Sequence, residues 1–414
     1  MTEKDSLPAQ PSGASEVELE LEITDLSRGG AGVARDSSGR VVFVPLTAPG
    51  DLARVRIVSG KNFRAAGSRR VREKKQYAQG ELIEIVRPSP ARQKARCPAF
   101  GRCGGCQWQH LSYDLQWRTK VNGVQHALKR VKVDLPFRSA EAWQEFPAER
   151  SWEYRNRIQL RGFGDKIGFY APRSHELVEL DRCDIARPEI NEAWEEIRNQ
   201  GKRLPEPYKV EVYVTTEGRV VRVWNAPHGA AGFRQVHDEQ NEKLRAWVGQ
   251  ALTPGRPLFD LFGGSGNLCV PIAHRMGEVH CVDISAPGER GTGVPDNIHF
   301  YRSAVVPWLL SRTKRNVKPA AGDLPESAIS TFAGPASAIL DPPREGLAEQ
   351  ITPIEKALRA LRVTEVVAVG CDPDAWARDL SRWIRRGWRF ERAAVLDLFP
   401  QTPHVEAMAL LKID

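Results

Sequence analysis

The chain has 414 residues, of which 41% are hydrophobic and 27% are charged, and its formal net charge is +8. This composition is typical of a soluble globular chain, and no stretch approaches the roughly 18 apolar residues that a membrane-spanning helix needs. At roughly 100–200 residues per domain, the length indicates two to four domains. The positive charge favours a polyanionic partner such as RNA or DNA, although a merely basic soluble protein fits it equally well.

Residues 1–15 are polar and rich in Ser, Pro, Gly and Ala, so we expect a disordered N-terminus. This segment lacks the apolar core of a signal peptide, and we therefore expect a cytoplasmic protein without a membrane partner. In that reducing compartment the seven cysteines should not form a disulfide framework. A metal, a cluster or catalysis is the alternative explanation for them.

Residues 16–76 are expected to form a small β-barrel. Alternating apolar residues at 17–23, a Gly-rich turn at 28–32 and apolar runs at 41–44 and 55–58 are typical of short strands. The last part of this region is strongly basic. Such a run is usually a solvated face, but on a small barrel it fits a surface that contacts an RNA backbone. The basic residues are Arg54, Arg56, Lys61, Arg64, Arg69, Arg70, Arg72, Lys74 and Lys75.

Two further domains are expected, a mixed α and β domain over residues 77–223 and an α/β domain over residues 224–414. The first has strand-like runs at 158–161 and 210–214 and a predicted helix at 190–200. In the second, apolar runs alternate with helical stretches, which predicts a doubly wound fold with a largely parallel sheet. Those runs are at 257–262, 280–283, 338–340 and 366–369.

Four cysteines of the middle domain are candidate ligands. Cys97, Cys103 and Cys106 have the spacing C-x5-C-x2-C, and Cys183 follows much later in the chain. Glycines between them allow the tight turns that bring three sulfurs to one face. The three-plus-one layout favours an iron–sulfur cluster over zinc, whose ligands usually come as two close pairs. Zinc and unligated cysteines are the alternatives.

Residues 258–267 are an apolar strand that leads into a Gly-rich turn, followed by a stretch expected to be helical at 268–276. At such a turn, glycines let the backbone approach a ligand closely. Asp283 ends the next predicted strand, where an acid can hydrogen-bond ribose hydroxyls. A Gly-rich turn alone is weak evidence, because many are plain turns. No Walker lysine motif accompanies it, so nucleoside triphosphate hydrolysis is not expected.

Two later strand ends carry reactive groups. Asp341 is followed by two prolines, which end its strand at the edge of the sheet where open α/β folds bind ligands. Cys371 follows the next apolar strand. A cysteine beside such a strand is usually buried and inert, which is the interpretation for Cys269 and Cys281, but at this edge a thiolate can be exposed. Glu406 precedes the last apolar run and, taken alone, reads as a surface acid.

Together these motifs resemble one family, the RNA uracil-5-methyltransferases, and most closely its large-subunit ribosomal branch with a TRAM domain and a [4Fe–4S] cluster. The resemblance covers nearly the whole chain after residue 15. The cysteine motif is highly specific to the family, as is the order of the three C-terminal motifs. The motifs are CPAFGRCGGCQWQH at 97–110 with Cys183, GFRQV at 232–236, DPPREG at 341–346, CDP at 371–373 and FPQTPHVE at 399–406.

The resemblance implies a Rossmann-like class I methyltransferase domain that uses S-adenosylmethionine and acts on RNA, with rRNA favoured over tRNA. It implies that Cys371 is the nucleophile that attacks carbon-6 of the uridine and that Glu406 is the base. Asp341 would sit between the cofactor and the target base. We also expect a monomer. The implied cofactor residues are Gln235, Phe262, Gly264, Gly266, Asn267, Asp283 and Asp341, and the implied cluster ligands are Cys97, Cys103, Cys106 and Cys183.

The chain departs from the family pattern in three places. After Asp283, where the family usually has a helix, the glycines and prolines of residues 285–297 oppose helix formation. The acid expected near the adenine is missing from residues 302–304. Gly263 and Gly370 replace the usual Cys and Ser. The first two departures weaken the adenosine half of the site, whereas the methyl-transfer half is intact.

Two other functions compete with the enzyme hypothesis. An RNA-binding paralogue would keep the basic barrel and the cluster but would no longer bind the cofactor. A zinc protein that only scaffolds RNA is the third hypothesis. The presence of Cys371, Asp341 and Glu406 favours the enzyme, because neither alternative needs them.

Overall fold

The computed structural model describes residues 17–62, 76–134, 142–227, 234–287, 291, 293–313 and 334–414. The expected disordered N-terminus, residues 1–15, lies outside the described residues. Most of the basic run of the predicted barrel does so too, namely Arg64, Arg69, Arg70, Arg72, Lys74 and Lys75. The chain divides into two compact units, one of residues 1–95 with 107–112 and one of residues 96–106 with 113–414.

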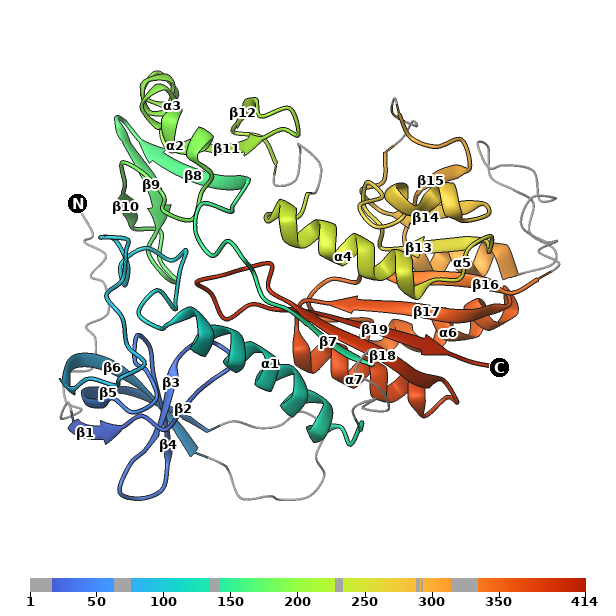
Figure 1. The fold of residues 1–414 in the computed structure, drawn as a ribbon. Helices are drawn as coiled ribbons and strands as arrows, with labels where there is room; N and C mark the ends of the chain where they lie inside the picture. The colour runs from blue at the N-terminus through green and yellow to red at the C-terminus, as the bar shows by residue number, and fades with distance from the viewer. Residues whose placement is uncertain are drawn as a thin grey trace, which may run out of the picture. The chain divides into compact units, whose positions relative to one another are not determined.

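The first unit is built on a six-stranded sheet in the order β1-β5-β6-β4-β3-β2 (Figure 1). The strand predicted from the apolar run at 41–44 is confirmed as β4, and the buried side chains of the sheet form one apolar cluster. The last strand ends at Arg87, so the sheet extends beyond the expected boundary at residue 76 because β5 and β6 pair along nearly their whole length. The strands are β1 (Glu18–Glu22), β2 (Asp25–Leu26), β3 (Gly32–Arg35), β4 (Val41–Val44), β5 (Leu52–Asn62) and β6 (Gln76–Arg87).

Residues 107–112 also belong to this first unit. The indole of Trp108 donates a hydrogen bond to the carbonyl of Gly30 (3.0 Å), and the ring of His110 contacts the carbonyl of Thr47 (3.1 Å). The cysteine motif is therefore divided. Its cysteines belong to the second unit and its QWQH end to the first.

The second unit contains a five-stranded antiparallel sheet in the order β10-β9-β8-β11-β12. The predicted strands at 158–161 and 210–214 are confirmed as parts of β8 and β11. The predicted helix at 190–200 is instead two helices that meet at Ala193. The elements are β8 (Arg157–Phe163), β9 (Lys166–Tyr170), β10 (Leu177–Glu179), α2 (Pro188–Glu192), α3 (Trp194–Gly201), β11 (Tyr208–Val214) and β12 (Val220–Trp224).

The second sheet of this unit has eight strands in the order β15-β14-β13-β16-β17-β19-β18-β7. Its first five strands are parallel, whereas β19 is antiparallel to both of its neighbours, which confirms a largely parallel sheet. The strands are β7 (Trp143–Phe146), β13 (Leu258–Leu261), β14 (Val279–Asp283), β15 (Ile298–Arg302), β16 (Ala336–Leu340), β17 (Val363–Gly370), β18 (Arg389–Leu396) and β19 (Glu406–Lys412).

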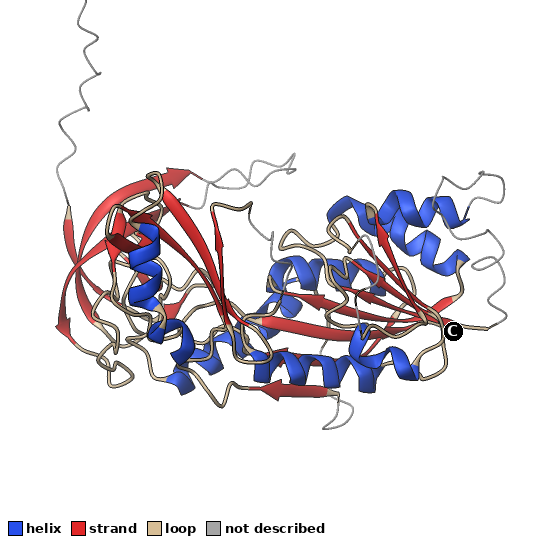
Figure 2. Cartoon of the chain, turned by 90° about the horizontal axis from the view of Figure 1, so that it is seen from above, coloured by secondary structure: helices blue, strands red, loops and turns tan. Residues whose placement is uncertain are grey.

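Helices cover both faces of this sheet (Figure 2). Helices α1, α5, α6 and α7 share one apolar core with it, and α4 shares another with the 3-10 helix after β13. Strand β7 and helix α1 come from the region assigned to the middle domain, so the boundary expected at 223/224 does not separate the two sheets. The helices are α1 (Tyr113–Arg130), α4 (Asp238–Ala251), α5 (Val305–Thr313), α6 (Ile351–Ala360) and α7 (Pro373–Ile384).

In the described part of the chain, every helix is too short or too polar to traverse a lipid bilayer.

A buried ion pair holds the segment that leads from β18 towards β19. Lys120 on α1 donates hydrogen bonds to the carboxylate of Asp397 (2.7 Å) and to the carbonyl of Phe399 (3.0 Å), and the hydroxyl of Tyr113 donates to the same carboxylate (3.1 Å). Both charged side chains are 0% exposed. A charge buried in this way depends on its partner, because water cannot replace it.

Replacing Lys120 by Met should therefore lower the free energy of unfolding by about 3–5 kcal/mol, since the Asp397 charge would stay buried without its cation. Arg130 on the same helix is the matched control, because its ion pair with Asp374 is exposed and Arg130→Met should cost about 0–1 kcal/mol. Urea unfolding of the three proteins measures both changes. Equal effects of the two substitutions would contradict a stabilising role for the buried pair.

Candidate active site

The carboxyl ends of the parallel strands bring several predicted site residues to one edge of the eight-stranded sheet. Strands β14 and β16 flank β13, and their register with it aligns the last residues of all three strands. Asp283 on one side and Asp341 on the other therefore flank the start of the Gly-rich turn at Phe262. This edge is where open α/β sheets bind their ligands.

The turn after β13 is tightly wound. Phe262 has φ +63°, Gly264 has φ +55° and Gly266 has φ +84°, all in the left-handed region that favours glycine. A Cβ on Gly266 would lie 2.6 Å from Val270, whereas a Cβ on Gly264 would have no atom within 4 Å. Gly264 therefore faces open space, where its backbone is accessible to a ligand. The stretch expected to be helical after the turn is a short 3-10 helix, Val270–Arg275.

Asn267 fastens this turn to helix α4. Its side-chain amide exchanges two hydrogen bonds of 3.0 Å with Asn241, and its side-chain oxygen accepts a third from Arg245 (2.8 Å). Contact of Asn267 with a cofactor stays a prediction beside this anchoring role. Gln235 is nearly buried, and its carbonyl accepts a hydrogen bond from Asn156 (2.9 Å).

The segment after Asp283 has no helix in its described residues, 284–287, 291 and 293–297, as its glycines and prolines predict. One oxygen of the Asp283 carboxylate accepts hydrogen bonds from the backbone (2.7 Å) and hydroxyl (2.6 Å) of Ser285. Arg302, where the family pattern has a glycine, donates to the carbonyl of Ala286 (2.9 Å). A side-chain contact with the backbone therefore holds the start of this segment.

Cys371 and Glu406 lie at the ends of adjacent strands. Strands β17 and β19 are antiparallel and pair Gly370 with Ala407, so the next residues along each strand meet at the same edge. Cys371 is partly buried, and Glu406 is only 3% exposed. Glu406 is therefore no surface acid. A thiol and a carboxyl group face one another at the edge that also carries Asp341.

The charges at this edge influence one another strongly. Burial and, to a smaller extent, the Glu406 charge raise the pKa of Cys371 to about 12, although the Arg344 charge opposes them. Burial and the Asp341 charge hold the pKa of Glu406 well above its usual range, and Arg344 again opposes them. Burial and the charges of Asp260 and Asp283 raise the pKa of Asp341 to about 7. Cys371 therefore holds its proton at neutral pH.

Two residues that the sequence did not single out belong to this edge. Arg344, within the DPPREG motif, is the cation that acts on Cys371 and Glu406. Burial and the Arg344 charge lower the pKa of His404 to about 4, so its imidazole is neutral at physiological pH. Arg344 lines a cavity of about 20 Å³ beside Cys371, roughly the volume that holds one water molecule.

Packing accounts for both unusual glycines. A Cβ on Gly370 would lie 2.9 Å from the Trp376 ring, which closes over the end of β17. A Cβ on Gly263 would lie 2.7 Å from the carboxylate of Asp260 and equally close to the sulfur of Cys281. Neighbouring side chains therefore occupy the space that a Ser or Cys would need.

The four cysteines Cys97, Cys103, Cys106 and Cys183 form no disulfide and are half-buried. Burial raises the pKa of Cys103, with a small contribution from Cys97, and burial raises the pKa of Cys183 to about 11, with a small contribution from Cys103. Asn191 accepts a hydrogen bond from the Cys183 backbone N–H (2.9 Å) and donates one to its carbonyl (3.1 Å). The distant fourth cysteine is therefore held near the other three.

The spacing of these sulfurs bears on what they bind. Among the described residues, no three of the four sulfurs lie within 4.8 Å of one another. Four thiolates on one zinc ion would lie roughly 4 Å apart, given a Zn–S distance of about 2.3 Å and tetrahedral geometry. In a four-iron cluster each thiolate binds a different iron, and the sulfurs lie further apart. Four thiols are a donor set that either a four-iron cluster or zinc can use.

Comparison with known proteins matches an N-terminal segment and the C-terminal half of the chain to two protein families. Residues 210–413 match the family described as tRNA (Uracil-5-)-methyltransferase, and residues 17–68 match the TRAM domain. The chain is 30% identical to an uncharacterized RNA methyltransferase of Bdellovibrio bacteriovorus, over 96% of this chain and 95% of that one. It is 29% identical to the 23S rRNA (uracil(1939)-C(5))-methyltransferase RlmD of Alkalilimnicola ehrlichii, over 98% and 97%.

A solved structure has the same fold along nearly the whole chain. The tRNA (uracil-54, C5)-methyltransferase of Pyrococcus abyssi, in complex with S-adenosyl-L-homocysteine, is 21% identical with a TM-score of 0.61, over 95% of this chain and 99% of that one. The methyltransferase sheet with its strand-end thiol and acids, the TRAM match and the full-length relatives agree with one another. The chain belongs to the family of RNA uracil-5-methyltransferases that carry an N-terminal TRAM domain.

Proposed function

We propose that this protein transfers a methyl group from S-adenosylmethionine to carbon-5 of a uridine in ribosomal RNA, through a covalent adduct on Cys371. The observation that carries the proposal is the meeting of Cys371 and Glu406 at adjacent strand ends, beside Asp341. Burying a carboxyl group such as Glu406 costs free energy, so its position at this edge favours a functional role. A paralogue that only binds RNA would have no use for this arrangement.

The cofactor would lie across the edge formed by β14, β13 and β16. Gly264 presents accessible backbone there, and the flanking carboxylates of Asp283 and Asp341 suit a ribose and a cation respectively. The cofactor supplies a methyl group activated by a positively charged sulfonium. Burial at the sheet edge strengthens the attraction of the acids for that charge. The residues assigned to it are Gln235, Phe262, Gly264, Gly266, Asn267, Asp283 and Asp341.

Cys371 and Glu406 divide the work on the uridine. Attack of the Cys371 thiolate on carbon-6 forms a C–S bond and makes carbon-5 nucleophilic, so that carbon-5 accepts the methyl group. Glu406, as the carboxylate, then removes the proton from carbon-5. The electron pair of that C–H bond re-forms the double bond and expels the thiolate. The target uridine has to be unpaired or flipped out of its helix to reach both groups.

Arg344 is assigned to the activation of Cys371. The thiol holds its proton in the free protein, so attack requires a cation that stabilises the thiolate. Arg344 is exposed and lowers the pKa of both Cys371 and Glu406. It therefore favours the ionised forms that the two steps need.

Replacing Arg344 by Met should raise the pKa of the Cys371 thiol and move the rising limb of kcat/KM to higher pH. Below the pKa, each unit of increase lowers the thiolate fraction about tenfold, so kcat/KM at pH 7 should fall by roughly that factor or more. Arg344→Lys should restore part of the loss because it restores the charge. The control is Arg385→Met, which removes an arginine at the C-terminal end of α7 and should leave the pH profile unchanged. A pH profile unchanged in Arg344→Met would refute this role.

Ribosomal RNA is the proposed substrate because several relatives are named as 23S rRNA enzymes. The protein is expected to act in the cytoplasm, as a monomer. Nucleoside mapping of RNA from cells with and without this gene tests the function. We expect one 5-methyluridine in 23S rRNA to disappear with the gene. Loss of a tRNA 5-methyluridine alone would reassign the substrate, and an unchanged pattern would reject the proposal.

We further propose that Cys97, Cys103, Cys106 and Cys183 hold a [4Fe–4S] cluster. The three-plus-one layout and the half-buried position of the four thiols support it. Methyl transfer needs no electron, so the role of the cluster would be to stabilise the fold of the middle domain or to position the RNA.

Protein purified without oxygen should be brown and contain about four iron atoms per chain, as four thiolates around one cubane require. Cys183→Ser should lose most of this iron because it removes one of the four ligands. Elemental analysis and the visible absorption spectrum measure both. Four bound sulfurs around zinc, without iron, would reject the cluster.

A further inference from the structure

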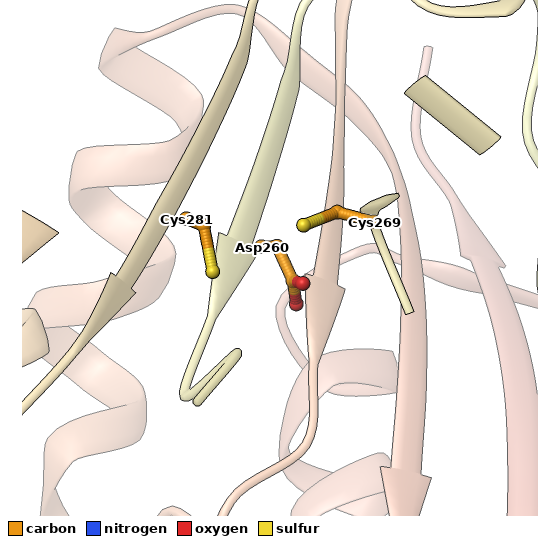
Figure 3. Close-up of side chains that lie close together, drawn as sticks. All are labelled: Asp260, Cys269 and Cys281. Carbon is orange, nitrogen blue, oxygen red and sulfur yellow. The ribbon is translucent and has the colours of Figure 1, made fainter. Parts of the chain in front are cut away.

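A second group of possible ligands lies beneath the turn of the cofactor loop, apart from Cys371 and from the four-cysteine group (Figure 3). Asp260 on β13, Cys281 on β14 and Cys269, just before the 3-10 helix, each offer one donor atom, and these atoms lie within 4.8 Å of one another. All three residues are 0% exposed. The three side chains therefore converge from separate elements on one interior point.

The backbone of the turn lies directly on this group. The missing Cβ of Gly263 leaves room for the Asp260 carboxylate and the Cys281 sulfur, each 2.7 Å from where that atom would be. The carbonyl oxygen of Gly264 lies 3.9 Å from the Cys281 sulfur. This carbonyl adds an oxygen donor to the two sulfurs and the carboxylate. Whatever binds there also fixes the turn.

In the described part of the chain, Asp260 has no cation beside it to offset its burial. Neither oxygen of its carboxylate makes a well-formed hydrogen bond among the described residues, and the group that acts on it most closely is Cys269, through its thiol and its backbone N–H. Buried carboxylates in native proteins are normally paired with a cation or bound to a metal, because an uncompensated one is costly. Its own surroundings supply thiols rather than a lysine or arginine.

We propose that Asp260, Cys269 and Cys281 bind a zinc ion, with the carbonyl of Gly264 as the fourth donor. Two sulfurs with oxygen donors in a compact set suit zinc, whereas magnesium and calcium require oxygen ligands alone. Both thiols lose their protons when the ion binds, so binding weakens as the pH falls. The ion ties β13 and β14 to the start of the 3-10 helix. This site is separate from Cys371 and from the four-cysteine group.

Elemental analysis of the full-length protein tests the site. After dialysis against a weak chelator, the wild type should retain one equivalent of zinc that the Cys269→Ser, Cys281→Ser double variant lacks. Its iron content should match that of the wild type. The matched control is Cys371→Ser, which also removes a thiol near this edge of the sheet and should retain the zinc. Equal zinc in the wild type and the double variant would overturn the proposal.

A measurement on the wild type alone decides the matter if the double variant does not fold. X-ray absorption at the zinc edge should show two sulfurs at about 2.3 Å and two oxygens at about 2.0–2.2 Å, the distances typical of such ligands. Zinc surrounded by four sulfurs would place the metal in the four-cysteine group instead. That result, or the absence of bound zinc, would overturn the assignment.

Discussion

The Cys371→Ala variant should lose methylation of RNA by at least about a thousand-fold, the scale of loss when a covalent nucleophile is removed. Without the sulfur, no bond forms at carbon-6, and carbon-5 of uracil stays a poor nucleophile. Cofactor binding should change little, because Cys371 follows β17, which lies between β16 and β19, whereas the cofactor loop follows β13. Transfer of a labelled methyl group measures the first effect and a cofactor titration the second.

The unchanged cofactor affinity is the control that separates chemistry from folding. Cys371 is only partly buried, so the loss of its sulfur should disturb packing little. If the variant no longer binds the cofactor, the substitution has disturbed more than the nucleophile. A melting curve then shows whether the protein is still folded. Methylation that persists in a folded Cys371→Ala protein would remove the covalent mechanism.

The Glu406→Gln variant should accumulate a covalent complex with methylated RNA, close to one RNA per enzyme. Attack by Cys371 and methyl transfer need no carboxylate, but the carbon-5 proton then has no base to accept it and the thiolate cannot leave. Turnover should fall by about 10²–10⁴, the usual contribution of a general base. Denaturing gel electrophoresis with labelled RNA reveals the complex as a shifted band.

A second buried glutamate provides the matched control for this trap. Glu355 on α6 is 5% exposed and accepts a hydrogen bond from Trp388 (3.2 Å), well inside the helical layer. Glu355→Gln makes the same substitution at a buried position away from the sheet edge, so no complex should accumulate. Adding Cys371→Ala to Glu406→Gln should abolish the band. A band that survives in that double variant would assign the nucleophile to another residue.

The sequence predicted the parts of the fold that depend on local pattern. Alternating apolar residues identified β1, β8 and β11, and continuous apolar runs identified β4 and the parallel strands at the centre of the large sheet. Strand ends of a parallel sheet meet at one edge, so motifs read separately could be assigned to one site. This reasoning groups Asp341 with Cys371, whereas Glu406 joins them only through the resemblance to the family.

Features that depend on distant contacts were not predictable. Strand β7 joins the large sheet through pairing with β18, although the two are far apart in the chain. The pairing of Lys120 with Asp397 likewise joins α1 to the segment before β19. Burial of Glu406 and the action of Arg344 on Cys371 follow from the same long-range packing. Cys269 and Cys281 were read as inert because nothing local indicates that Asp260 lies beside them.

The most direct test of covalent uridine methylation uses the wild-type protein and RNA that carries 5-fluorouridine in place of uridine. Fluorine replaces the proton that Glu406 removes, so the reaction should stop after methyl transfer. We predict a complex that resists denaturation, depends on S-adenosylmethionine and yields, after proteolysis, a modified peptide linked through Cys371. Active enzyme that forms no such complex, or a complex linked through another residue, would contradict the mechanism.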